Sequence, residues 1–191
     1  MSLRSIFVSG LITLVSLTAA SGCKPFKLKP PAGFAEVDNH RHGAHMKGSD
    51  DVGLKVSVFD NVKGGTLAFW SHDLVEKLGR RGYVLTSQKP ATSANGVHGT
   101  RFDFDYVPQG TDGPKRFYSA VLFATDRNLI VVQLAGKAEL QGTYSSRMDE
   151  IAAATKTRGC RAGSKICKSE QPGSLTALAA APAATLADGN P

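Results

Sequence analysis

Two apolar segments separated by only three residues constrain the fold of this chain more than any other feature. Residues 116–125 and 129–135 are almost continuously apolar, and residues 126–128, with the sequence Asp-Arg-Asn, connect them. Such a short connection joins strands into an antiparallel hairpin, and strands that are apolar at successive positions need cover on both faces. The sequence therefore predicts a hairpin near the centre of an antiparallel sheet.

Two further segments alternate with the period of a strand that has one covered face. In the first, apolar side chains recur at Val52, Leu54, Val56 and Val58. In the second, residues 100–106, one side carries Phe102, Phe104 and Tyr106 and the other side carries Arg101, Asp103 and Asp105. We expect the aromatic side to be buried and the charged side to be solvated. Paired carboxylates for acid–base chemistry at Asp103 and Asp105 are the less favoured interpretation.

Two segments have the spacing of amphipathic helices. Thr66 can cap a helix whose apolar face carries Leu67, Trp70, Leu74 and Leu78, and Gly82 can end it. A second helix is predicted over residues 138–156, with a stripe formed by Leu140, Tyr144, Met148, Ile151 and Thr155. The order of strands, helix, strands and helix predicts an α+β domain, an antiparallel sheet packed with two main helices.

The N-terminus has the composition of an export signal. Residues 1–22 carry one charge, Arg4, and an apolar run over residues 6–17 that is short for a membrane-spanning helix. The sequence Ala-Ser-Gly-Cys ending at Cys23 resembles the lipobox of bacterial lipoproteins, with Ala20 where lipoboxes usually carry Leu. The resemblance implies cleavage before Cys23 and diacylation of its thiol. An ordinary cleaved signal with an incidental cysteine is the alternative.

The same resemblance implies a location. Lys24 follows the cysteine, and in enterobacterial lipoprotein sorting a residue other than Asp at this position implies the outer membrane. We therefore expect a lipid-anchored protein of the bacterial cell envelope that faces the periplasm. Lys24, Lys27 and Lys29 can supplement the anchor if the membrane surface is anionic. The formal net charge of +7 is otherwise spread along the chain, so nucleic acid is not an expected partner.

The pairing of the two remaining cysteines follows from the assignment of Cys23 to lipid. If Cys23 carries lipid, Cys160 and Cys167 are left as a pair in an exported chain, where disulfides persist. Their spacing is not the C-x-x-C spacing of oxidoreductases, and no further cysteine is present to complete a metal site. We predict a structural disulfide between Cys160 and Cys167.

Composition divides the remainder of the chain into three parts. Residues 23–33 are basic and interrupted by proline, which is typical of a tether. Residues 169–191 are rich in Ala and Pro and poor in bulky apolar residues, which predicts a disordered tail. A single folded domain is expected over residues 34–168.

The residues that most suggest ligand chemistry are His40, His42 and His45, with Met46 directly after them. Imidazole nitrogens bind zinc, copper or nickel, and a thioether suits reduced copper. The spacing matches no strong metal signature, and Arg41 places a positive charge among them. A zinc or copper site is therefore the alternative to a solvated strand or loop, and no other cofactor is expected.

Other residues with chemical potential favour structural roles. His72 and His98 are expected at the surface, no serine lies in a nucleophile-elbow sequence, and no glycine-rich phosphate loop is present. We therefore predict no catalytic residues and expect that the protein is not an enzyme. The helical spacing of Trp70 favours a place in the core. The alternative is a groove for a peptide, glycan or lipid lined by Phe69, Trp70, Tyr83, Tyr106 and Tyr118.

The order of elements resembles the PsbP-like fold. The resemblance lies in the runs DDVGLKVSVFDN, TLAFWSHDLVEKLGRRGYVL, GVHGTRFDFDY and RFYSAVLFATDRNLIVVQLAG with the helix that follows, over about residues 34–156. This fold is shared by an extrinsic photosystem subunit, a Ran-binding nuclear import factor and several bacterial lipoproteins, most of which bind or scaffold other proteins. The resemblance implies a binding module and carries over no site residues.

These observations together predict a lipid-anchored, non-enzymatic module of the cell envelope that binds an envelope protein or another macromolecule. Metal binding or metal delivery through His40, His42 and His45 is the alternative function.

Overall fold

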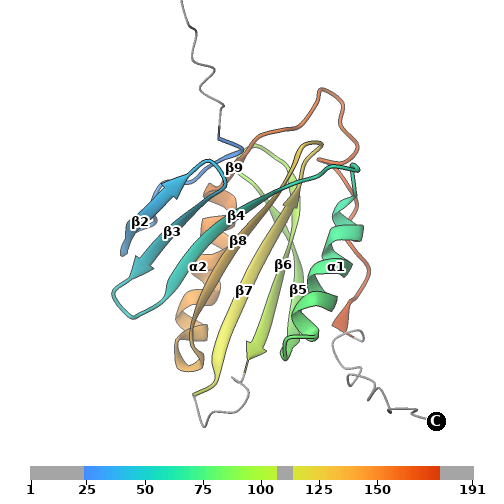
Figure 1. The fold of residues 1–191 in the computed structure, drawn as a ribbon. Helices are drawn as coiled ribbons and strands as arrows, with labels where there is room; N and C mark the ends of the chain where they lie inside the picture. The colour runs from blue at the N-terminus through green and yellow to red at the C-terminus, as the bar shows by residue number, and fades with distance from the viewer. Residues whose placement is uncertain (1–23, 107–113, 177–191) are drawn as a thin grey trace, which may run out of the picture.

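The computed structural model describes residues 24–106 and 114–176 (Figure 1). Its main element is a seven-stranded antiparallel sheet with the strand order β2-β3-β4-β8-β7-β6-β5. The strands are β2 (Phe34–His40), β3 (Gly43–Gly48), β4 (Gly53–Asp60), β5 (Tyr83–Thr92), β6 (His98–Tyr106), β7 (Arg116–Ala124) and β8 (Asn128–Lys137). The helices are α1 (Leu67–Gly79) and α2 (Gln141–Ala154), the latter preceded by the 3-10 turn η1 (Ala138–Leu140). The predicted α+β class is confirmed.

The hairpin of β7 and β8 lies at the centre of the sheet, as the sequence predicted, and its turn is held by Thr125. The backbone N–H of Thr125 donates to Asn128 O at 2.8 Å, and the Asn128 N–H donates back to Thr125 Oγ1 at 2.9 Å. The neighbouring strands β4 and β6 pair with β8 and β7 along most of their length. The central strands are therefore enclosed within the sheet plane on both sides.

The two helices cover opposite faces of the sheet. Met148 and Ile151 of α2 pack in a core with apolar side chains of β3, β4, β7 and β8. Leu67 and Val75 of α1 pack on the other face, in a core with Phe102 and Phe104 of β6. Figure 1 shows α1 beside β5 and β6, far from β2 and β3 at the opposite edge of the sheet. The α1 side of the sheet is consequently open beyond the helix.

Part of the segment expected to be a tether, residues 26–28, packs against the folded domain. The strand β1 (Phe26–Lys27) pairs with β9 (Lys156–Thr157) in a separate two-stranded sheet. Phe26 and Leu28 are buried in the core on the α2 side. A local reading of the proline-interrupted sequence missed this, because the pairing partner lies at the other end of the domain.

The folded domain also continues past residue 168. The Leu175 side chain is buried in the core on the α1 side, and its N–H donates to Gln88 Oε1 at 3.0 Å. The Gln88 side-chain amide donates to Pro172 O at 3.1 Å. Residues 169–176 are therefore fixed against β5, whereas residues 177–191 of the expected tail lie outside the described residues. The signal segment and Cys23 lie outside them as well.

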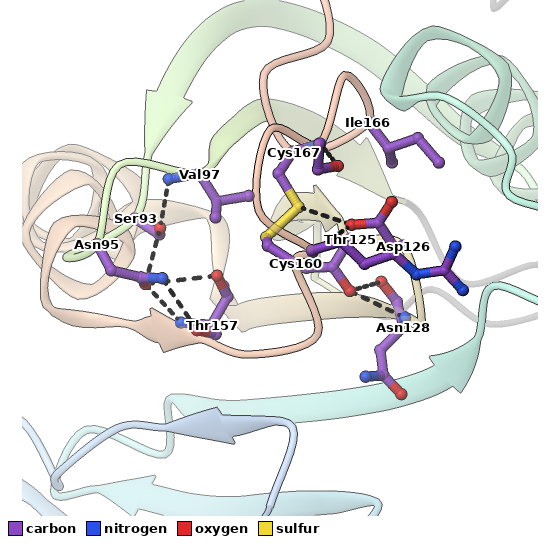
Figure 2. The surroundings of a disulfide bond; sticks show 12 residues. Ser93, Asn95, Val97, Thr125, Asp126, Asn128, Thr157, Cys160, Ile166 and Cys167 are labelled. Atoms are coloured by element: carbon purple, nitrogen blue, oxygen red, sulfur yellow. Dashed lines mark hydrogen bonds between the residues drawn. A yellow bond between two sulfur atoms is a disulfide. The ribbon is translucent and has the colours of Figure 1, made fainter.

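A disulfide joins Cys160 and Cys167, the pair that the sequence predicted (Figure 2). The loop that it closes rests on the β7–β8 turn, where the Arg161 N–H donates to Asp126 Oδ2 at 2.8 Å. This hydrogen bond lowers the pKa of the Asp126 carboxyl below its usual value. Within the described parts of the chain, no helix is long and apolar enough to cross a membrane.

Candidate functional site: a groove beside the first helix

A groove of about 410 Å³ lies between α1 and the part of the sheet that the helix leaves open. Its floor is formed by Leu122, Leu129 and Val131 of the central hairpin, and its wall by residues of α1, among them Trp70 and Leu74. The opposite rim is formed by Phe59 and Asp60 at the end of β4. The groove thus presents an apolar surface to solvent beside an aromatic wall.

The wall begins at the N-terminus of α1, which the Thr66 side chain caps by accepting from Phe69 N–H at 3.3 Å. This confirms the N-cap predicted from the sequence. The Phe69 ring meets the Trp70 ring edge to face, with centroids 4.9 Å apart. The first turn of the helix therefore carries two adjoining aromatic side chains, of which Phe69 is exposed.

The buried side chain of Asn61 fixes the Trp70 indole. Its Oδ1 accepts from the Trp70 Nε1–H at 3.1 Å and from the Gly65 N–H at 2.8 Å. Its Nδ2 donates to Thr125 O at 2.8 Å and to Gly65 O at 3.0 Å. One amide therefore ties together the end of β7, the loop before α1 and the aromatic wall of the groove. A Cβ at Gly65 would lie 2.4 Å from Trp70 Nε1, so this close approach requires glycine.

A strip of hydrogen-bonded polar side chains crosses the sheet from β7 to β4. The Tyr118 hydroxyl donates to Gln133 Oε1 at 2.9 Å, and Gln133 Nε2 donates to Ser57 Oγ at 2.9 Å. Burial, with a further contribution from the nearby Tyr83, raises the pKa of the Tyr118 phenol well above its usual value. The phenol therefore stays protonated at physiological pH and remains a donor. The groove combines an apolar floor with a preorganised polar strip.

The histidines of the sequence-predicted cluster lie in a neighbouring hollow of the surface, to which Phe59 also contributes. His40 ends β2, and its Nε2 is 3.5 Å from Asp38 Oδ2 while its Nδ1 accepts from the His42 N–H at 3.2 Å. His45 lies opposite Asp38 in the β2–β3 pairing. In residues 24–106 and 114–176, no group of three His, Cys, Asp or Glu is arranged to hold a metal ion.

Met46 does not join these histidines, because its side chain is fully buried in the core on the α2 side. The thioether is therefore unavailable as a fourth ligand. The zinc or copper site at His40, His42 and His45 stays a prediction from the sequence.

The face of β6 that was expected to be solvated is buried. Arg101 is only 1% exposed, and its guanidinium donates from Nε to Asp103 Oδ1 at 2.9 Å and from Nη1 to Asp149 Oδ1 at 2.8 Å. Asp103 Oδ1 also accepts from the Ser119 hydroxyl at 2.6 Å, and Arg101 Nη2 donates to Ser145 Oγ at 2.9 Å. Helix α2 covers this face, so the prediction was wrong for Arg101 and Asp103. Asp103 is held in a buried ion pair with Arg101.

The carboxyl of Asp149 ties α2 to the sheet through the same arginine. Its partial burial opposes ionisation, but hydrogen bonds and charge from Arg101, and then from Lys89, outweigh that effect and lower the pKa of Asp149. The carboxylate is thus ionised at neutral pH and bridges a buried cation and a surface cation.

Of the other residues that the sequence suggested as functional, some line the groove and others lie away from it. His72 Nδ1 is 3.9 Å from Glu76 Oε2 on exposed helix surface, and His98 Nδ1 is 3.1 Å from Ser169 O. In residues 24–106 and 114–176, neither histidine forms a hydrogen bond with a serine hydroxyl. The rings of Tyr83 and Tyr106 stack near the β5 edge, with their centroids 4.4 Å apart. Of the aromatic set proposed from the sequence, Trp70 and Tyr118 line the groove.

The sequence did not indicate three residues that shape the groove: Gln133, which lines it, Ser57, which bonds to Gln133, and Asn61, which holds Trp70. Asn61 lies between the strand that ends at Asp60 and the helix capped by Thr66, and Asn side chains in such loops commonly bond to nearby backbone groups, which was an available signal. Gln133 interrupts an otherwise apolar strand, which was an available signal. Its partner Ser57 could not be assigned without the β4–β8 register.

No family model matches the chain, and no curated protein matches it. Among solved structures, the chain is similar to cyanobacterial PsbP from Synechocystis, with a TM-score of 0.51 and 14% identity over 70% of this chain and 87% of that one. It also matches the Ran-binding protein Mog1p of Saccharomyces cerevisiae, with a TM-score of 0.48 and 10% identity over 70% of this chain and 90% of that one. LpqN, involved in cell envelope biogenesis of Mycobacterium tuberculosis, matches with a TM-score of 0.48 and 9% identity over 70% of this chain and 83% of that one. The likeness to the cyanobacterial protein shows that the domain has a PsbP-like fold.

Proposed function

We propose that this chain is a lipid-anchored, non-enzymatic protein of the bacterial cell envelope that binds a protein partner in the groove beside α1. The observation that carries the binding role is the groove itself, in which the indole of Trp70 is fixed by Asn61 next to an apolar floor. The lipobox resemblance at Cys23 and the disulfide between Cys160 and Cys167 support an exported, anchored chain. The Lys24 that follows the cysteine supports the outer membrane as its location.

The groove has the properties of a protein-binding surface. Its volume of about 410 Å³ accommodates a few side chains of a peptide segment. Tryptophan and tyrosine are enriched at the energetic centres of interfaces, and a side chain that is already fixed loses little conformational entropy on binding. The exposed Phe59 on the rim and the exposed Phe69 beside Trp70 enlarge the apolar surface. These features suit an extended segment of a larger partner.

The side chains around the groove support binding without catalysis. Asp73 is paired with Lys77 at 2.8 Å on the helix wall, and the raised pKa of Tyr118 removes it as a base at neutral pH. A general base needs a pKa near the working pH and an unoccupied path to its substrate. We therefore assign Asp73 and Tyr118 to recognition.

A photo-crosslinking amino acid at Leu74 is expected to capture the partner in intact cells. Leu74 is partly exposed and lines the groove, whereas the matched control Ala153 is exposed on α2, on the other side of the sheet. Adducts are expected from position 74 and none from position 153, measured by gel shift and identified by mass spectrometry. Trp70→Ala should reduce the adduct from position 74 about 30-fold, as expected for loss of a central hot spot. Equal capture from both positions would overturn the groove as the binding site.

Cys23→Ala is expected to abolish acylation and release the protein from the membrane. Without the thiol there is no attachment point for the acyl chains, which supply nearly all of the anchoring free energy. Incorporation of labelled palmitate and membrane fractionation measure both effects. Cys160→Ala is the control and should retain the label. Acylation that persists in Cys23→Ala would show that the lipobox assignment is wrong.

A further inference from the structure

The first described residue is held at one end of the sheet. The Lys24 ammonium donates to Asn39 Oδ1 at 2.6 Å, beside the β2–β3 turn, and the Arg158 N–H donates to Pro25 O at 2.7 Å. The position next to the proposed lipid site is thus fixed against two other segments of the chain. In Figure 1 this is the upper end, where β1 and β9 lie.

Four loops gather at the same end, which we call the basic end: residues 41–42, 61–66, 125–127 and 158–168, together with residues 24–25. The Asn61 N–H donates to Arg127 O at 2.8 Å, which joins the β4–α1 loop to the β7–β8 turn. The disulfide loop rests on that turn through Asp126, whose Oδ2 is 3.8 Å from Cys167 Sγ (Figure 2). The loops therefore form one continuous surface.

The basic end carries eight cationic side chains, all exposed or partly exposed: Lys24, Arg41, Lys63, Arg127, Arg158, Arg161, Lys165 and Lys168. Within the described residues none of the eight forms an ion pair, whereas Lys47, Lys77, Arg80 and Lys89 elsewhere each pair with a carboxylate.

Few carboxylates oppose this charge. Asp126 is the one acidic residue inside the basic end, and Asp38, Asp60 and Glu170 border it. Asp126 already accepts from the Arg161 N–H. Clustered, unpaired positive charge of this kind attracts an anionic surface.

An exposed apolar side chain lies among these cations. Val62 is 85% exposed in the β4–α1 loop, and Lys63 follows it. The loop is fixed at its base by the buried Asn61. An apolar side chain flanked by lysine is suited to the boundary between headgroups and acyl chains of a bilayer.

We propose that the basic end docks on an anionic lipid bilayer, with Val62 entering the interface and the lysines and arginines contacting lipid phosphates. The orientation rests on the proposed acylation of Cys23, whereas the surface itself belongs to residues 24–168. Helix α1 starts at this end and runs away from it (Figure 1). Docking therefore leaves the groove open sideways, along the membrane, where a neighbouring envelope protein can reach it.

The test uses the mature chain with Cys23→Ser, so that the domain binds without acyl chains. It is expected to co-sediment with vesicles rich in phosphatidylglycerol, to bind vesicles of phosphatidylcholine weakly, and to dissociate as salt screens the charges. Lys63→Glu, Arg127→Glu and Arg161→Glu together should lower the partition coefficient at least 100-fold, because each cation near an anionic surface contributes about fivefold.

The matched control reverses three charges at the opposite end of β7 and β8: Lys115→Glu, Arg116→Glu and Lys137→Glu. Net charge changes equally, and binding should fall far less. Thermal unfolding checks that both triple variants are folded. Equal losses in the two variants would show a nonspecific charge effect and overturn the proposal, as would equal binding to both kinds of vesicle.

Val62→Trp, combined with Trp70→Phe so that position 62 carries the single tryptophan, distinguishes a bilayer from a soluble polyanion. Its fluorescence is expected to shift to shorter wavelength on phosphatidylglycerol vesicles and to stay unshifted with polyglutamate. An unshifted emission on vesicles would overturn membrane insertion. Failure of palmitate labelling at Cys23 would contradict the anchor alone, so the two proposals fail separately.

Discussion

Replacing Arg101 with leucine is expected to destabilise the domain by about 3–5 kcal/mol. The guanidinium is buried beneath α2 and donates to Asp103, Asp149 and Ser145. Without it, the carboxylate of Asp103 stays buried with no cation beside it, which costs far more than the ion pair contributes. Urea unfolding monitored by circular dichroism measures the loss.

The control for Arg101→Leu is Lys89→Met, which removes the surface cation that shares Asp149. This exposed pair should contribute at most about 1 kcal/mol. The double variant Arg101→Leu, Asp103→Leu should recover part of the loss, because it removes the uncompensated carboxylate as well. If Lys89→Met cost as much as Arg101→Leu, burial of the guanidinium would not be the source of its stability.

The buried position of Arg101 could not be predicted from local sequence patterns. Alternation along residues 100–106 correctly predicted a strand whose aromatic side is buried. It could not show that the charged side is buried too, because the cover is a helix that begins at Gln141, far along the chain. Charged side chains on one face of a predicted strand indicate solvent exposure only if no other element of the fold covers that face.

Local patterns were sufficient for several other elements. The three-residue connection fixed the β7–β8 hairpin, and Thr66 with its apolar spacing fixed α1. The stripe of the second helix placed Tyr144, Met148 and Ile151 in the core. In each case the signal lies within about ten to twenty residues, which is the range over which turn chemistry, capping and periodicity act.

The groove was harder to predict from the sequence, because it exists only where α1 fails to cover the full width of the sheet. Helix α1 is too narrow to cover a seven-stranded sheet, and what it leaves open depends on strand order. The sequence indicated Trp70 and Tyr118 as candidates, yet favoured the core for Trp70. The indole packs against the core on the α1 side and is also partly exposed, since its position is set by Asn61 as well as by helical spacing.

Asn61→Ala is expected to destabilise the domain by about 3 kcal/mol and to loosen the groove. The substitution removes four hydrogen bonds, of which the one to Thr125 O is buried and the other three are partly buried, and it leaves polar groups of Gly65, Trp70 and Thr125 without this partner. A buried polar group left unsatisfied costs about 1–3 kcal/mol. Trp70 is the single tryptophan of the chain, so its intrinsic fluorescence reports the release of the indole directly, and urea unfolding reports stability.

Asn39→Ala is the matched control, because Asn39 is an exposed asparagine with side-chain hydrogen bonds to Glu36 and Lys24. It should cost less than about 0.5 kcal/mol and leave the fluorescence unchanged. Gly65→Ala tests the same contact from the other side, since its Cβ would displace the indole. Unchanged fluorescence in both Asn61→Ala and Gly65→Ala would refute the role of this loop in fixing Trp70.

The contact between Asn61 and the Trp70 indole also predicts an effect on partner binding. If Asn61 acts on the partner only through the indole, Trp70→Phe should lower crosslinking from position 74 while costing less stability than Asn61→Ala. Asn61→Ala should lower both. If Asn61→Ala lost stability but still captured the partner as well as the native chain does, the position of the indole would not matter for binding. Recognition would then be assigned to the floor residues Leu129 and Val131 instead of the aromatic wall.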